Sequence, residues 1–94
     1  MVTVGDIYNY IDTFAPFHTA MGFDNVGLLV GGKHCPVTSV MVSMDITPEV
    51  ISEAVSQKAE LIISHHPVIF QPLKRLSPTD VPYLLVQNGL CAIA

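Results

Sequence analysis

The stretch LIISHHP, residues 61–67, limits what this chain can fold into more than any other part of it. A short, continuous apolar run is typical of a strand covered on both faces, as in a parallel sheet, whereas a strand covered on one face alternates apolar and polar residues. Pro67 has no N–H to donate to a neighbouring strand, so the strand must end before it. The run therefore predicts a buried parallel strand whose carboxyl end carries His65 and His66.

A second strand and a helix are predicted just before this run. Residues 40–45, VMVSMD, have the composition of a strand. Thr47 suits the N-cap of a helix, Pro48 its first position and Glu49 its positively polarised first turn. Apolar residues then recur at helical spacing, so one face of the helix should pack on a sheet. Together these segments predict a βαβ unit with two parallel, neighbouring strands.

This unit brings Asp45 to the same edge of the sheet as His65 and His66. Open α/β sheets bind ligands at the carboxyl ends of their strands, and neutral imidazole is a common metal ligand, so the histidine pair suggests a metal site. Two histidines do not complete a site of about four ligands. Two structural alternatives stay open: Asp45 as a capping or turn carboxylate, and the histidines as one hydrogen-bonded and one partly exposed loop residue.

The amino-terminal part of the chain predicts one helix and one short strand. Thr3 and Asp6 have the spacing of a capping box, and an apolar stripe follows them as far as Phe14. Residues 24–27 predict a turn, and residues 28–30 a strand that two glycines close. The spacing of these glycines is not that of a phosphate-binding loop, so a turn is the better interpretation.

The carboxyl-terminal part predicts a further helix and strand. Ser77 and Asp80 have capping-box spacing, with Pro78 at the first helical position, and an apolar segment at residues 90–94 predicts another parallel strand. The fold class is therefore α/β, with a mostly parallel sheet and flanking helices in a single domain over residues 1–94.

Composition excludes some classes of function. Half of the residues are hydrophobic and only 13% are charged. We therefore expect the apolar segment at residues 90–94 to be buried only against other chains or against later sequence of a longer protein. A net charge of −4 argues against nucleic acid as a partner. The adjacent Lys74 and Arg75 predict a solvated surface or, beside a metal site, a contact to an anionic substrate.

Neither a membrane span nor a secretion signal is evident. No apolar run approaches the roughly 20 residues of a membrane span, and no basic segment followed by an apolar core marks the amino terminus. Cys35 and Cys91 lie in no CxxC pattern. These features predict no membrane partner, a cytoplasmic location and reduced thiols.

Several segments, in this order, resemble the N-terminal part of the Nif-three-like dinuclear metal-centre proteins, some of which are known as type 2 GTP cyclohydrolase I. The segments are DNVGLLVG, MDIT followed by PEVISEA, LIISHHPVIF and VPYLLVQNGLCAIA. The resemblance implies an α/β fold, a ring-like homohexamer and two divalent metal ions, with zinc, iron, manganese, nickel or magnesium as candidates. It covers nearly the whole chain, as the N-terminal part of a longer protein.

The resemblance also assigns roles to residues. It implies that His65 and His66 are metal ligands, that Asp24 and Asn25 line or support the site, and that an Asp, a His and a Glu from later sequence complete it. Alone, this chain should then bind at most one ion, weakly. Two functions follow: a metal-dependent hydrolase acting on a nucleotide such as GTP, or a non-catalytic metal-binding or regulatory scaffold that assembles as a ring.

Overall fold

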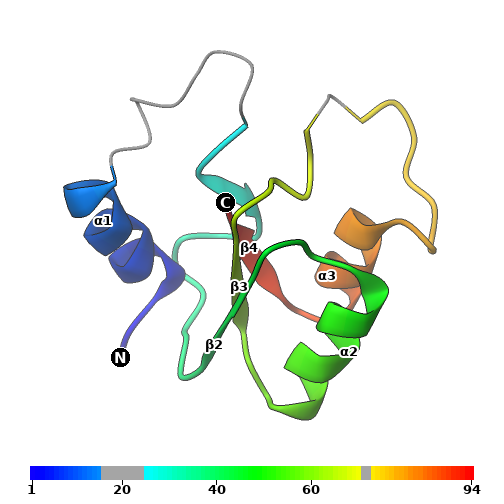
Figure 1. Cartoon of the computed structure of the whole chain (residues 1–94). Helices are drawn as coiled ribbons and strands as arrows, with labels where there is room; N and C mark the ends of the chain where they lie inside the picture. The colour runs from blue at the N-terminus through cyan, green and yellow to red at the C-terminus, as the bar shows by residue number, and fades with distance from the viewer. Residues whose placement is uncertain (16–24, 71–72) are drawn as a thin grey trace.

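The computed structural model describes residues 1–15, 25–70 and 73–94, and within these it forms a four-stranded sheet with helices on both faces (Figure 1). The strand order is β1-β4-β3-β2, with β1 antiparallel to β4 and the other pairs parallel. The predicted α/β class with a mostly parallel sheet is therefore confirmed. In chain order the elements are α1 (Val4–Phe14), β1 (Leu28–Val30), β2 (Val40–Ser43), α2 (Pro48–Ser56), β3 (Leu61–Ser64), α3 (Val81–Gln87) and β4 (Cys91–Ile93).

The predicted βαβ unit is formed by β2, α2 and β3. Thr47 caps α2, because its hydroxyl accepts the N–H of Val50 at 3.2 Å, and Pro48 opens the helix as expected. The two strands are parallel neighbours, in register from Val40 opposite Leu61 to Ser43 opposite Ser64. The carboxyl ends of β2 and β3 therefore lie side by side.

Two apolar cores cover the two faces of β3 and β4. Ile62 and Ala92 pack with α2 and α3 on one face, while Leu61 and Ile93 pack under α1 on the other. Successive residues of a strand point to opposite faces, so an unbroken apolar run is what a strand between two layers requires. This arrangement explains the composition of LIIS.

The apolar carboxyl-terminal segment is buried within the chain itself. Cys91, Ala92 and Ile93 are each less than 5% exposed, because β4 lies between β3 and β1 and under helices on both faces. The prediction that this segment is buried only against other chains or later sequence is therefore wrong. Sequence reasoning did not foresee that β1 would pair with it.

The two predicted capping boxes have different outcomes. At α1 the box is confirmed, since the Thr3 hydroxyl accepts the Asp6 N–H and the Asp6 carboxylate accepts the Thr3 N–H. At α3 it is wrong: the helix begins at Val81, after Asp80. The Asp80 carboxylate accepts the N–H of Ser77 at 2.7 Å and so closes a turn that precedes the helix.

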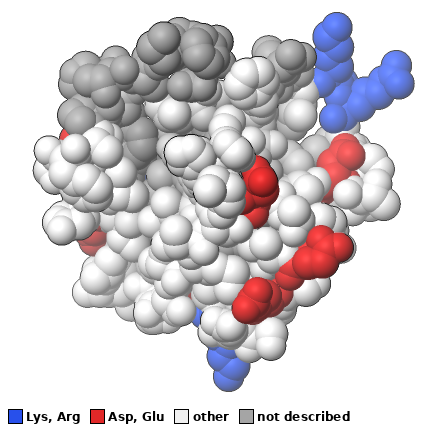
Figure 2. Space-filling model, in the orientation of Figure 1, with Lys and Arg blue, Asp and Glu red and all other residues white. Residues whose placement is uncertain are grey.

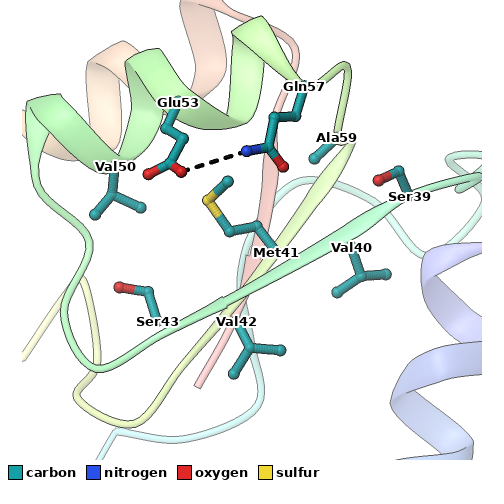
Figure 3. Close-up of a pocket in the computed structure, with 9 residues that line it drawn as sticks. All are labelled: Ser39, Val40, Met41, Val42, Ser43, Val50, Glu53, Gln57 and Ala59. Atoms are coloured by element: carbon teal, nitrogen blue, oxygen red, sulfur yellow. Dashed lines mark hydrogen bonds between the residues drawn. The ribbon is translucent and has the colours of Figure 1, made fainter.

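The edge strand β2 is only partly covered. Met41 points toward α2, beside the hydrogen-bonded pair of Glu53 and Gln57, at a hollow of about 360 Å³ (Figure 3). On the other face of the sheet α1 does not cover β2, and Val42 is 76% exposed. On α1, the predicted stripe of Val4, Ile7, Tyr8 and Ile11 packs in the core, whereas Phe14 at the end of the helix is 66% exposed.

Charged side chains are sparse and scattered on the face that Figure 2 shows. No helix in the described parts of the chain is long and apolar enough to cross a membrane.

Glu60 holds the amino ends of the strands together. Its carboxylate accepts the N–H groups of Thr38 at 2.7 Å and Ser39 at 3.0 Å, together with the Thr38 hydroxyl. Its own N–H donates to Ser39, and its carbonyl accepts the N–H of Cys91. The hydrogen bonds from Thr38 and Ser39 lower the pKa of the Glu60 carboxyl group.

We predict that Glu60→Gln removes a pH-dependent part of the stability. A carboxyl group whose pKa is lower in the folded state stabilises the fold above its unfolded pKa, and this contribution is lost as the pH falls through its folded pKa. Urea unfolding at about pH 7 and about pH 3 should therefore show the variant less stable than wild type at pH 7, with the difference shrinking in acid. Glu53→Gln, which makes the same charge change on α2, should show no such convergence. A Glu60 difference that is constant with pH would contradict the prediction.

Candidate metal centre at the carboxyl ends of β2 and β3

The parallel register carries Asp45 to His66. Beyond the paired serines at the strand ends, the N–H of His65 still donates to the Ser43 carbonyl at 3.1 Å and that of His66 to the Met44 carbonyl at 3.0 Å. Asp45 and His66 are thus each two residues past a paired position. Asp45 Oδ1 lies 2.7 Å from Nδ1 of His66, so the predicted juxtaposition at one edge of the sheet is found.

Two serines, missed in the sequence, shape the backbone at this edge. Ser43 donates its hydroxyl to the carbonyl of Asp45 at 2.5 Å, and Ser64 donates its hydroxyl to the carbonyl of His66 at 2.7 Å. A hydrogen bond from a serine side chain to the backbone two residues later favours a turn in the chain. The signal was present in the sequence, because VSMD and ISHH carry serine at the same distance before Asp45 and His66.

The two imidazoles lie close together but have different surroundings. Their ring centres are 4.9 Å apart, with the ring planes at 58°. His65 borders a hollow of about 420 Å³ whose other lining residues are Val42, Ser43, Met44, Ile63 and Ser64. The side chains of His66 and Asp45 are 58% and 61% exposed. This edge of the sheet therefore offers two imidazoles that face outward, one next to a mostly apolar hollow and one next to a carboxylate.

The carboxylate determines which nitrogen of His66 is left for a ligand. An ionised Asp45 can only accept, so Nδ1 of His66 must donate and its Nε2 keeps a free lone pair. An imidazole that binds a metal through one nitrogen while the other donates to a carboxylate is a recurring arrangement in metal sites. Imidazole nitrogen and carboxylate oxygen suit zinc, iron, manganese and nickel.

These side chains form only part of a ligand set. Across residues 1–15, 25–70 and 73–94, no three His, Cys, Asp or Glu side chains converge in a way that could hold a metal ion. The assignment of His65 and His66 as ligands stays a prediction, as does a site-lining role for Asp45.

Asn25 supports the loop that follows the histidines. Its side-chain amide donates to the carbonyl of Ile69 at 2.5 Å, which joins the segment before β1 to the chain just beyond β3. Asp24, the other residue of the predicted pair, lies outside the described residues. Lys74 and Arg75 are exposed, and no contact found among the described residues joins them to Asp45 or His66.

Comparison with known proteins identifies the family. Residues 2–94 match the sequence model of Duf34/NIF3, NGG1p interacting factor 3. The chain belongs to the Duf34/NIF3 family. The resemblance inferred from DNVGLLVG and LIISHHPVIF is thereby confirmed.

Curated relatives share a name. A Clostridium perfringens protein named GTP cyclohydrolase 1 type 2 homolog is 46% identical over 68 residues, which are 72% of this chain. A Staphylococcus aureus protein of the same name is 42% identical over 94 residues, or 97% of the chain. In both cases the chain spans only 26% of the relative's length.

Solved structures have the same fold. A Staphylococcus aureus hypothetical protein superposes with a TM-score of 0.93 at 36% identity, over 99% of this chain and 32% of that one. A Bacillus cereus protein related to NIF3 superposes with a TM-score of 0.91 at 32% identity, over 98% of this chain and 26% of that one. The chain therefore has the Duf34/NIF3 fold, and it spans 32% and 26% of the two solved chains.

We predict that Asp45 fixes the tautomer of His66. Long-range ¹H–¹⁵N NMR at about pH 8, where free imidazole is neutral, should show the proton of His66 on Nδ1. In Asp45→Ala the acceptor is gone, and the proton should move to Nε2. The ring of His65 serves as an internal control and should not change. A proton on Nε2 of His66 in the wild-type chain would contradict the prediction.

Proposed function

We propose that this chain contributes His65 and His66 to the metal centre of a metal-dependent hydrolase that acts on a nucleotide such as GTP. One observation carries the proposal: the 2.7 Å contact between Asp45 and Nδ1 of His66, next to a second imidazole at the carboxyl ends of the parallel strands β2 and β3. An Asp, a His and a Glu from later sequence would supply the remaining ligands. The complete centre would hold two divalent ions, in a cytoplasmic protein.

In this mechanism the chain's own residues position the ligands. Asp45 holds the proton on Nδ1 of His66 and fixes the plane of the ring, while Ser43 and Ser64 fix the backbone on either side. Divalent ions bound there would polarise the substrate and lower the pKa of water. The name of the curated relatives favours GTP, with hydrolysis at the C8 position of its purine ring, and Lys74 and Arg75 are then candidates to hold the triphosphate.

The second candidate function is a non-catalytic metal-binding or regulatory scaffold that assembles as a ring. It is favoured by the apolar side chains that α1 leaves uncovered beside the histidines: Val42 is 76% and Met44 61% exposed. The hollow next to His65 includes both of them. Such a surface suits contact with another subunit of a homohexamer.

We predict that the chain binds one divalent ion weakly, and through the histidine pair. In a Zn²⁺ titration followed by calorimetry, His65→Ala and His66→Ala should each abolish measurable binding, while Asp45→Ala should weaken it by roughly 10-fold or more through loss of ring orientation. His34→Ala removes an exposed imidazole elsewhere and is the matched control, so its affinity should equal wild type. Full affinity in either histidine-pair variant would place the ligands elsewhere.

The enzyme and scaffold hypotheses predict different results for a protein of the relatives' full length. Loaded with two divalent ions and given GTP, the enzyme should release the C8 carbon as formate, and His66→Ala should stop the release. Retention of two metals and of the ring assembly without any formate release would favour the scaffold.

A further inference from the structure

The thiols of Cys35 and Cys91 lie together beneath α1, although they are far apart in sequence. Cys91 is 4% exposed on β4, and Cys35 is partly buried against the same apolar cluster. Cys35 packs against the cluster that contains Cys91, and its thiol is close enough to influence the pKa of the Cys91 thiol. Neither thiol has a role in the proposed metal centre. Cys91 is paired with Leu61 at the amino end of β3, whereas the histidines follow its carboxyl end.

A tight turn brings the two residues together. Antiparallel pairing of Val30 with Ala92 places Gly31 directly over Cys91, where a Cβ would clash with the Cys91 sulfur. Gly31 also has a φ of +100°, which side chains with a Cβ rarely adopt. The chain then reverses, since Cys35 donates its N–H to the carbonyl of Gly32 at 3.2 Å. Gly31 thus supplies both the space and the backbone angle that the approach of the thiols requires.

The turn is also fastened to α1. The carbonyl of Cys35 accepts the N–H of Val4 at 2.9 Å, and the carbonyl of Lys33 accepts the N–H of Gly5 at 2.8 Å. The Lys33 ammonium lies 4.4 Å from the ring centre of Tyr8. A covalent bond between Cys35 and Cys91 would therefore join the start of α1 to the central strand β4.

The two sulfurs differ in access and in reactivity. Burial raises the pKa of the Cys91 thiol, and the neighbouring Cys35 raises it further, while a hydrogen bond from the Gly32 backbone lowers it in part. The more exposed Cys35 is the sulfur that a reagent in solution can reach first. The pair thus has an accessible attacking thiol and a sheltered one that can resolve the product.

We propose that Cys35 and Cys91 form a reversible disulfide by exchange with a low-molecular-weight disulfide. The Cys35 thiolate attacks one sulfur of the reagent, which forms a mixed disulfide and releases the first small thiol. The Cys91 sulfur, having lost its proton to solvent, then attacks the Cys35 sulfur and displaces the second small thiol. Two protein thiols are oxidised, one small disulfide is reduced to two thiols, and the released protons go to those thiols.

The test exposes the chain to oxidised glutathione and follows the products by intact mass and peptide mapping. Wild type should lose two hydrogen atoms without retaining glutathione, and one peptide should link Cys35 to Cys91. Its Tm should rise by an amount on the order of 10 °C, because the bond closes a long loop, and dithiothreitol should reverse the change.

Single-cysteine variants test the order of the steps. Cys91→Ala should stop at the mixed disulfide and hold one glutathione on Cys35, whereas Cys35→Ala should react more than 10-fold more slowly because only the buried thiol remains. Circular dichroism checks that each variant is folded, and Cys91→Ser replaces Cys91→Ala should the latter fail to fold. Glutathione retained by the wild-type chain, or two thiols that still alkylate freely after oxidation, would overturn the proposal.

Discussion

The parallel register between β2 and β3 is the constraint on which the fold and the candidate site both depend. With Val40 opposite Leu61, one face of β3 joins the core under α1 and the other joins the core under α2 and α3. A slip by one residue would exchange the two faces and move Asp45 out of line with His66. Glu60 secures this register at the amino ends of the strands, and the serine-closed turns continue it past their carboxyl ends.

Sequence reasoning predicted the features that local patterns encode. The buried run of β3, the start of α2 and the capping box of α1 each depend on neighbours within a few residues, and all three are found. Strand order is different, because the pairing of β1 with β4 joins Leu28 to Ile93 and has no local signal. The same limitation hid the burial of the carboxyl-terminal segment and the approach of Cys35 to Cys91. At α3, local patterning misled, since Asp80 serves a turn before the helix instead of capping it with its side chain.

Part of the candidate site was predictable because it follows from the βαβ unit, which local sequence patterns encode. Two histidines that follow a buried strand, and an aspartate that follows its parallel neighbour, must share an edge once the βαβ unit is accepted. The structure shows two contacts that the spacing of residues in the sequence could not predict. Asp45 contacts Nδ1 of His66, and His65 borders a hollow that includes Val42 and Met44. The apolar composition is likewise only partly accounted for by the cores, because the face of β2 that α1 leaves open keeps those two side chains exposed.

The residues at the amino ends of the strands and those at the carboxyl ends differ in how much they contribute to stability. At the amino ends, Glu60 is hydrogen-bonded to Ser39 and Cys91, and the turn at residues 31–35 is hydrogen-bonded to the start of α1, so changes there act on the fold. At the carboxyl ends, Asp45 and His66 are both more than half exposed, and an exposed pair of this kind typically stabilises a protein by only about 0–1 kcal/mol. Stability therefore gives little reason for this aspartate to contact this histidine. The metal centre proposed above would give a reason for this contact: the imidazoles would be the ligands, the carboxylate would orient one ring, and the serines would hold the backbone that carries them.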